Sequence, residues 1–198
     1  MDIYIALAHY PVTNKQGELV ATAVTNLDIH DLARTARTYG VAGYYIVTPV
    51  AQQRSLASRI VSHWREGEGQ KYNPIRAKAF ELVQVTTSIE DTVKDIQTRS
   101  GVRPLTVVTG ANLKDNCLTY EALRQQIADD PGACLVIFGT GWGLTPDFIE
   151  SCDVKLPALR CGRPQHDGYN HLSVRAAVAI VLDRLLGERD ALTPTGRT

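Results

Sequence analysis

The sequence predicts an α/β fold in which helices cover both faces of a mostly parallel sheet. Short apolar runs alternate along the chain with segments whose apolar residues recur at helical spacing, the pattern of repeated β–α units. The 198 residues are 44% hydrophobic and 21% charged, near the averages of globular domains, and no apolar run approaches the roughly 18 residues of a membrane span. We expect one domain over 1–187, a flexible tail over 188–198, and no membrane association.

The first half of the chain reads as two strand–helix units followed by a loop. The run 3–8 is short and apolar, and 43–47 is rich in β-forming residues, so both are predicted as strands. The segments 27–39 and 51–64 carry apolar side chains every three or four positions, which predicts helices. The polar stretch 66–74 is predicted as a loop.

The second half continues the alternation and ends in an unusual helix. Three further strands and two further helices are predicted from the same patterns, at 80–85, 105–108 and 134–138 and at 88–99 and 120–128. Ser88 and Thr145 are the expected caps of the helices that follow them. The last helix, 172–186, is apolar almost all round, which requires burial on most sides and favours packing against a second subunit.

Charge is balanced overall but clustered locally. The chain has 21 basic and 21 acidic residues, which excludes a uniformly basic nucleic-acid-binding protein. The segment 54–78 contains six basic residues and only two acidic ones, and Trp64 and Tyr72 lie among them. A solvated helix face is one interpretation, and a surface that binds the phosphates of RNA is the other. The six basic residues are Arg54, Arg59, Arg65, Lys71, Arg76 and Lys78.

Cysteine and histidine spacing gives no indication of a metal site. None of the four cysteines belongs to a C-x-x-C pair, and the five histidines include no H-E-x-x-H motif. We therefore expect no bound metal. We interpret the four cysteines as reduced, partly buried thiols. Together with the absence of signal-peptide features, this interpretation predicts a cytoplasmic protein.

The glycine-rich segment 139–143 (GTGWG) follows the most hydrophobic predicted strand. Ligands of open α/β sheets bind outside the carboxyl ends of the strands, and three glycines in five residues allow the backbone to approach a ligand and expose amides to it. A tight turn without a ligand is the alternative. Neither the dinucleotide fingerprint nor a phosphate-binding loop is present, which disfavours a nucleotide-binding protein. The unpatterned stretch 157–171 is long enough to be functional.

Three segments resemble motifs of the SPOUT class of S-adenosylmethionine-dependent RNA methyltransferases: LVIFGTGWGLTPDF at 135–148, VKLPAL at 154–159 and YNHLSVRAAVAIVLDRLLG at 169–187. The segment DLARTARTYGV at 31–41 is similar to the A-R-T-A segment of the ribose-methylating branch. With KYNPIRAKAFELV at 71–83, the whole pattern most resembles a family of RNA methyltransferases associated with tRNA guanine-N1 methyltransferase.

This resemblance implies a C-terminal trefoil knot, a homodimer formed through the C-terminal helix, S-adenosylmethionine as cofactor, and structured RNA (tRNA or rRNA) as substrate. The cofactor carries no phosphate, which agrees with glycine turns that lack a phosphate-binding lysine. By the resemblance, twelve residues would line the cofactor pocket. They are Thr109, Gly110, Gly139, Thr140, Gly141, Leu156, Pro157, Ala158, Asn170, His171, Leu172 and Ser173.

The catalytic residues are predicted less firmly. Arg34 matches the arginine that the ribose-methylating branch uses at the acceptor hydroxyl, but Asp28 stands where that branch has asparagine. If the acceptor is a base nitrogen instead, Asp167 or His166 would serve better as the general base. The alternative function is a knotted RNA- and cofactor-binding protein that has little activity of its own and assists a partner methyltransferase.

Overall fold

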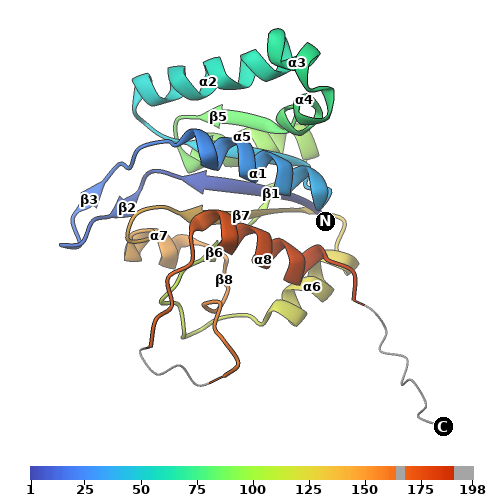
Figure 1. Ribbon diagram of the computed structural model, residues 1–198. Helices are drawn as coiled ribbons and strands as arrows, with labels where there is room; N and C mark the ends of the chain where they lie inside the picture. Colours follow the sequence, from blue (N-terminus) through green and yellow to red (C-terminus); the bar gives the residue numbers. More distant parts are fainter. Residues whose placement is uncertain (164–167, 190–198) are drawn as a thin grey trace.

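The computed structural model describes residues 1–163 and 168–189, and its centre is a parallel sheet of six strands. The strands are β1 (Asp2–Ala8), β4 (Gly43–Val47), β5 (Val83–Thr86), β6 (Leu105–Thr109), β7 (Ala133–Gly139) and β8 (Val154–Lys155). Their order is β5–β4–β1–β7–β6–β8, and every neighbouring pair runs parallel (Figure 1). The predicted α/β fold with a mostly parallel sheet is confirmed.

Helices cover both faces of this sheet, as the alternating pattern predicts. They are α1 (Asn26–Thr38), α2 (Ala51–Arg65), α3 (Glu68–Tyr72), α4 (Pro74–Phe80), α5 (Ile89–Ser100), α6 (Tyr120–Asp129), α7 (Pro146–Ser151) and α8 (Val174–Leu186). One face packs against α1, α2, α6 and α8, and the other against α5 and α7. Among the described residues, none of these helices combines the length and apolarity needed to cross a bilayer.

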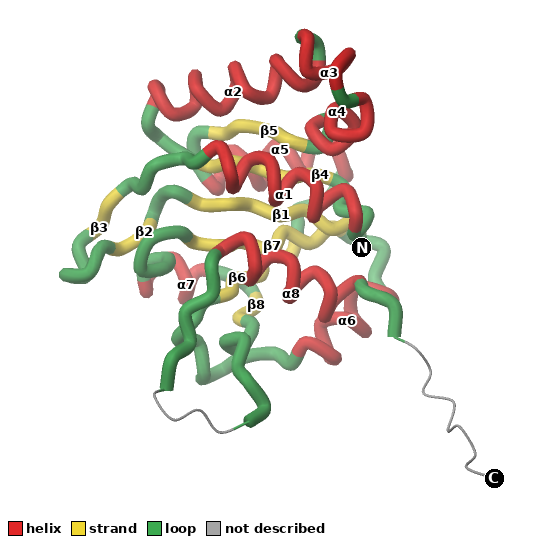
Figure 2. The backbone as a smooth tube through the Cα atoms, in the orientation of Figure 1, coloured by secondary structure: helices red, strands yellow, loops and turns green. Residues whose placement is uncertain are grey.

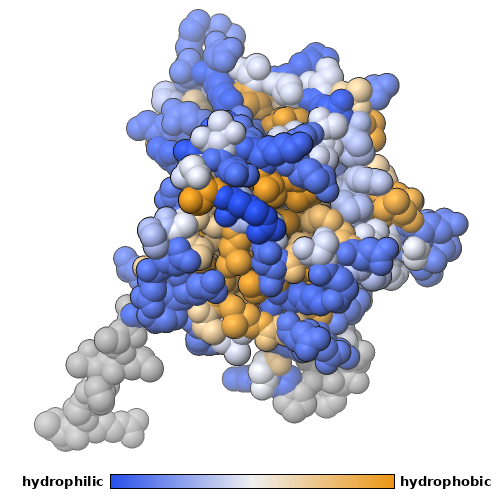
Figure 3. Space-filling view, turned by 180° about the vertical axis from the view of Figure 1, so that it is seen from behind, coloured by the Kyte–Doolittle hydropathy of each residue, from blue (hydrophilic) through white to orange (hydrophobic). Residues whose placement is uncertain are grey.

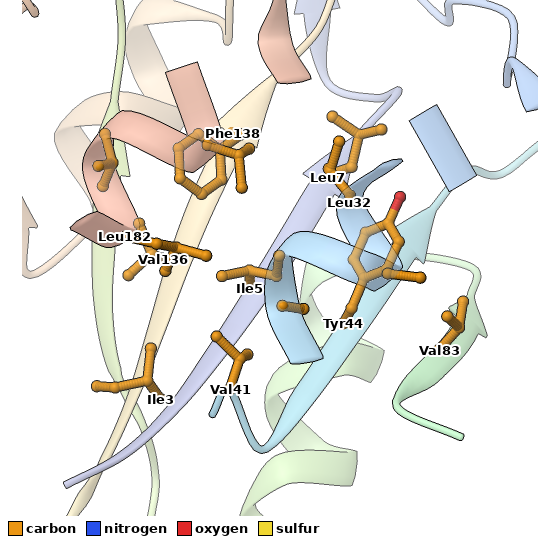
Figure 4. Packing of buried hydrophobic residues seen from close by; sticks show 14 of the residues in the cluster. Ile3, Ile5, Leu7, Leu32, Val41, Tyr44, Val83, Val136, Phe138 and Leu182 are labelled. Carbon is orange, nitrogen blue, oxygen red and sulfur yellow. The ribbon is translucent and has the colours of Figure 1, made fainter. Parts of the chain in front are cut away.

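The core is divided between the two faces by the alternation of side chains along each strand. Ile3, Ile5 and Leu7 of β1 point toward α1 and α8, whereas Tyr4 and Ala6 belong to the cluster under α5 and α7. Figure 4 shows the first cluster, in which side chains of β1, β7, α1 and α8 meet. Because β1 is covered on both sides, its sequence is continuously apolar rather than alternating.

Polar side chains fix where the long helices begin. Ser88 Oγ accepts a hydrogen bond from the Asp91 backbone N–H at 3.1 Å, which confirms the cap predicted for α5. Ser173 caps α8 in the same way, through the Ala176 N–H at 3.2 Å. Thr145 precedes α7 as predicted, but its side chain makes no capping hydrogen bond.

Two predictions between α2 and β5 were wrong. The stretch 66–74 is not a plain loop, because it contains α3 and the start of α4, where the Asn73 side chain accepts from the Arg76 N–H at 2.9 Å and Pro74 opens the helix. The strand predicted from residue 80 begins only at Val83. Phe80 ends α4 and stacks on Trp64, with ring centroids 5.8 Å apart.

A short hairpin in the connection from β1 to α1 was not predicted. It pairs β2 (Val12–Thr13) with β3 (Leu19–Val20) in antiparallel register. Strands of two residues are too short to show an alternating pattern in the sequence. The hairpin projects from the carboxyl edge of the sheet (Figure 2).

The chain order of the strands reverses beside β1, and this reversal locates the site. From β1 the chain builds outward through β4 and β5, then returns to place β7 directly against β1. In open α/β sheets such a switch point leaves a crevice at the carboxyl ends of the strands. The helices α1 and α8 lie side by side and both begin at this edge.

Candidate functional site

A cleft of about 980 Å³ lies at the carboxyl edge of the sheet. Its wall is built by five segments, from four connections of the chain, that meet at the same edge. These are the β1–α1 connection with the hairpin, the turns after β6, β7 and β8, and the approach to α8. A second, smaller hollow of about 290 Å³ lies between α5 and α7. Figure 3 shows apolar side chains gathered on the rear surface between polar margins.

The glycine-rich loop after β7 forms one side of the cleft, but its glycines serve mainly the close approach of the chain to itself. The hairpin is bonded to this loop through Thr13 N–H to Gly143 O at 2.9 Å and Trp142 N–H to Thr13 O at 3.2 Å. A Cβ added to Gly139 would lie 2.8 Å from Leu144 Cγ. The prediction that this loop offers its amides to a ligand was therefore wrong for Trp142 and Gly143, whose N–H groups are bonded within the protein.

Nine of the twelve residues predicted to line a cofactor pocket do line this cleft. They are Thr109, Gly110, Gly139, Thr140, Gly141, Pro157, Asn170, His171 and Leu172. Leu156 is buried in the core, Ala158 donates its N–H to Leu113 O at 3.0 Å, and Ser173 caps α8. The segments expected to meet are thus brought together, although the side chains of Leu156 and Ala158 are buried in the protein and do not face the cleft.

The predicted catalytic residues are placed differently. Arg34 is exposed on α1 and does not line the cleft. Asp167 and His166 lie outside the described residues. Within 1–163 and 168–189, the acidic and basic side chains that line the cleft are those of Asp28 and Arg175, and sequence reasoning had assigned a role to neither. A signal existed for Arg175, because it is the single charged residue between Val174 and Leu182, the apolar stretch of this helix.

An ion pair between α1 and α8 fixes these two residues. Arg175 Nη1 donates to Asp28 Oδ1 at 2.7 Å, and the Thr25 hydroxyl donates to Asp28 Oδ2 at 2.6 Å. Arg175 Nε also lies 3.4 Å from Asp31 Oδ2. Among the described residues that line the cleft, Asp28 is the only carboxylate, Arg175 is the only arginine, and there is no lysine. The fixed charges of the wall therefore cancel.

A buried histidine stands behind the hairpin side of the cleft. His9 is fully buried, and desolvation lowers the pKa of its imidazole to about 4, with the Asp28 charge opposing the shift. His9 Nδ1 lies 3.0 Å from the Thr22 hydroxyl, which contacts the Thr140 hydroxyl, and Thr140 in turn donates to Ala8 O at 3.1 Å. Because Thr140 donates to Ala8 O, the Thr22 hydroxyl must donate to Thr140 and accept from His9. The neutral imidazole of His9 therefore carries its hydrogen on Nδ1. The chain of bonds holds the hairpin against the glycine-rich loop.

The six basic residues predicted to bind RNA do not form one free surface. Arg65 donates to the carbonyls of Phe80, Glu81 and Val83 and so stabilises the α4–β5 connection. Arg54 donates to Thr48 O at 3.0 Å, at the carboxyl edge. The α3–α4 end of the cluster lies at the opposite, amino edge of the sheet (Figure 1).

That amino-edge part of the cluster is nevertheless open to a partner. Tyr72 and Ile75 are 86% and 83% exposed, and Lys71 and Lys78 are exposed beside them in the chain. Arg76 lies over the Trp64 ring at 4.8 Å. Arg59 is exposed on α2, so it extends the cationic surface toward Arg54.

Residues 2–187 match a family model described as SAM-dependent RNA methyltransferase. A relative named tRNA (guanine-N(1)-)-methyltransferase, from Oleidesulfovibrio alaskensis, is 43% identical over 187 residues, which is 94% of this chain but only 42% of that protein. An uncharacterized protein of Aquifex aeolicus is 40% identical over 93% of this chain and 88% of its own length.

A similar solved structure is that of the SpoU methyltransferase AviRb from Streptomyces viridochromogenes, in complex with the cofactor AdoMet. It superposes with a TM-score of 0.53 at 15% identity, over 92% of this chain and 56% of that one. At this level of identity the likeness concerns the fold.

Proposed function

Because the chain belongs to the family of SAM-dependent RNA methyltransferases, we propose that its cleft binds S-adenosylmethionine and that the protein transfers the methyl group to structured RNA. The observation that carries the proposal is the cleft itself. The turns after β6, β7 and β8 and the approach to α8, each of which matches a cofactor-binding segment in the family resemblance, meet there around about 980 Å³. We take residues 1–187 as one methyltransferase domain.

The chemistry of the cleft wall fits this cofactor. When bound, S-adenosylmethionine supplies a methyl group on a sulfonium, which is already electrophilic. A di- or triphosphate would find one arginine and no lysine among the described lining residues, whereas a phosphate-free adenosine derivative needs neither. Phe138, Leu113 and Pro157 offer apolar contact, and the Tyr120 hydroxyl donates to Pro157 O at 3.1 Å, which fixes that turn.

The protein itself would bind the cofactor, orient its methyl group toward the acceptor, and remove a proton from the acceptor. We propose the segments 109–113, 139–141, 157–159 and 170–172 as the cofactor-binding wall, largely through backbone groups. Arg34 remains our candidate for the acceptor side if the acceptor is a ribose hydroxyl, and Asp167 or His166 if it is a base nitrogen. The name guanine-N1 methyltransferase belongs to a relative of which this chain spans less than half, so it leaves both acceptors open.

We propose that the C-terminal segment is knotted. Both limbs of the segment contact the connection between β6 and α6: Ala158 N–H donates to Leu113 O at 3.0 Å, and Asn170 Nδ2 donates to Ala111 O at 3.4 Å. A segment held against this loop on its way in and on its way out is the arrangement expected of a trefoil knot.

We also propose a homodimer formed through α8. Ile180 of α8 is 37% exposed, and Leu27 and Leu172 are exposed near the starts of α1 and α8. These positions leave apolar area on the helix pair that a second copy would cover.

For RNA, we propose a surface that runs from Arg54 and Arg59 on α2 to Lys71, Arg76 and Lys78, with Tyr72 available for stacking. The free thiols of all four cysteines support activity in the reducing cytoplasm.

The second candidate function, a cofactor-binding protein that assists a partner methyltransferase, is supported by the position of Arg34 outside the cleft. One experiment separates the two. The protein is incubated with unmodified bulk RNA and methyl-labelled S-adenosylmethionine, and the labelled nucleoside is identified by mass spectrometry. Incorporation into tRNA or rRNA is expected, and its modified atom identifies the acceptor. Cofactor binding without incorporation would favour the second function.

A further inference from the structure

Arg175 is held at the cleft in a way that its contribution to packing does not explain. It is the second residue of α8 and lines the cleft with its side chain 34% exposed, while the side chain of its partner Asp28 is 8% exposed. Both carboxylate oxygens of Asp28 already accept hydrogen bonds, from Arg175 and from Thr25. Each carboxylate oxygen of Asp28 therefore has a partner, whereas part of the Arg175 guanidinium has none within the described part of the chain.

The arginine keeps donors free for a ligand. A guanidinium has five N–H groups in one plane, and Arg175 directs Nη1 to Asp28 while Nε lies near Asp31. Its second terminal nitrogen, Nη2, makes no hydrogen bond within the described part of the chain. Because burying an ion pair gains little net stability, the buried Asp28 is better explained as an anchor that orients the guanidinium.

We propose that Arg175 is the oxyanion-binding residue of the cleft and that Asp28 is its positioning residue. This proposal rests on the proposed function, since it takes the cleft to receive a methyl donor and an RNA. Two sources of oxyanion reach such a cleft: the carboxylate in the amino-acid part of the cofactor, and a phosphate of the acceptor RNA. A planar guanidinium binds either through paired hydrogen bonds, and no other arginine or lysine among the described lining residues competes with it.

Three probes test the proposal on Arg175→Gln. They are S-adenosylhomocysteine, 5′-methylthioadenosine, which keeps the adenosine thioether but lacks the carboxylate, and an unmodified tRNA transcript. If the cofactor supplies the oxyanion, S-adenosylhomocysteine binding weakens at least tenfold in calorimetry, while methylthioadenosine binding stays within twofold. If RNA supplies it, tRNA binding weakens and the slope of log affinity against log salt concentration falls by about one.

Two further variants keep the test decisive. Arg175→Lys retains the positive charge opposite Asp28 but loses the planar fork, so it covers the case in which Arg175→Gln does not fold. We expect it to weaken binding of the same probe at least threefold. Arg37→Gln removes an exposed arginine at the far end of α1 and should change no binding.

Unchanged binding of S-adenosylhomocysteine and tRNA by a folded Arg175 variant overturns the assignment. Failure of the unaltered protein to bind either adenosine compound contradicts the proposed function instead, and the tRNA measurement then still decides the role of Arg175. If the unaltered protein binds none of the three probes, both proposals fall.

Discussion

Replacing Gly139 with alanine should destabilise the protein by about 1–3 kcal/mol, the usual cost of forcing extra volume into a packed site. The new Cβ would lie 2.8 Å from Leu144 Cγ and 2.9 Å from the Leu144 backbone nitrogen. A side chain could turn aside, but the backbone at Leu144 is fixed by its bridge to Val12 and by the bond from Thr145 N–H to Pro11 O at 3.3 Å. The strain must therefore spread into the hairpin and the glycine-rich loop.

Thermal unfolding followed by circular dichroism measures the effect. For a chain of this size each kcal/mol corresponds to about 2–4 °C in Tm, so a decrease of roughly 2–12 °C is expected. Gly110→Ala is the matched control, because its Cβ would make only ordinary contact with the Leu113 side chain at 3.4 Å, and its Tm should change little. Equal stability of the two variants would refute the view that Gly139 is required for close approach of the chain.

Three further predictions concern charge and surface. The pKa of His9 falls from 6.5 to about 4 on folding, so between these pH values the unfolded chain binds a proton that the folded protein does not. The free energy of unfolding should therefore decrease by up to about 3 kcal/mol as the pH falls through that interval. Urea titrations should show a smaller dependence of this free energy on pH for His9→Asn, and an unchanged dependence would contradict the assignment. Arg65→Ala should lower Tm, whereas Lys78→Ala should leave Tm unchanged and weaken tRNA binding in a filter assay; the reverse pattern would exchange their roles. Ile180→Glu should convert the proposed dimer to a monomer in sedimentation analysis, and a dimer that survives this change is not formed through α8.

The sequence predicted well those elements whose burial or capping is visible in their own residues. The strand β4 and the helix α5 match their predicted positions closely, because continuous apolar runs and a serine cap act locally. The two-residue strands of the hairpin, by contrast, are held by the bonds of β2 to the glycine-rich loop more than a hundred residues away. No local pattern encodes such a contact. Phe80 was misassigned because an aromatic residue buried under Trp64 looks the same in a strand or a helix.

The site shows the same division. Segments matching the family motifs were expected to meet and do so around the cleft, since the carboxyl ends of parallel strands share one edge. The pairing of Asp28 with Arg175 spans 147 positions and depends on α1 and α8 lying side by side. Sequence alone identified Asp28 as a departure from its motif, but the partner that explains its charge became visible only in the folded chain.

Hydrogen–deuterium exchange with and without S-adenosylmethionine tests the central claim, that the cleft at the carboxyl edge holds the methyl donor. The account predicts that the cofactor slows exchange in 109–113, 139–144 and 157–159, and in the start of α8. The α5–α7 hollow on the opposite face should show no change. Slower exchange confined to that hollow, or none anywhere at saturating cofactor, would contradict it.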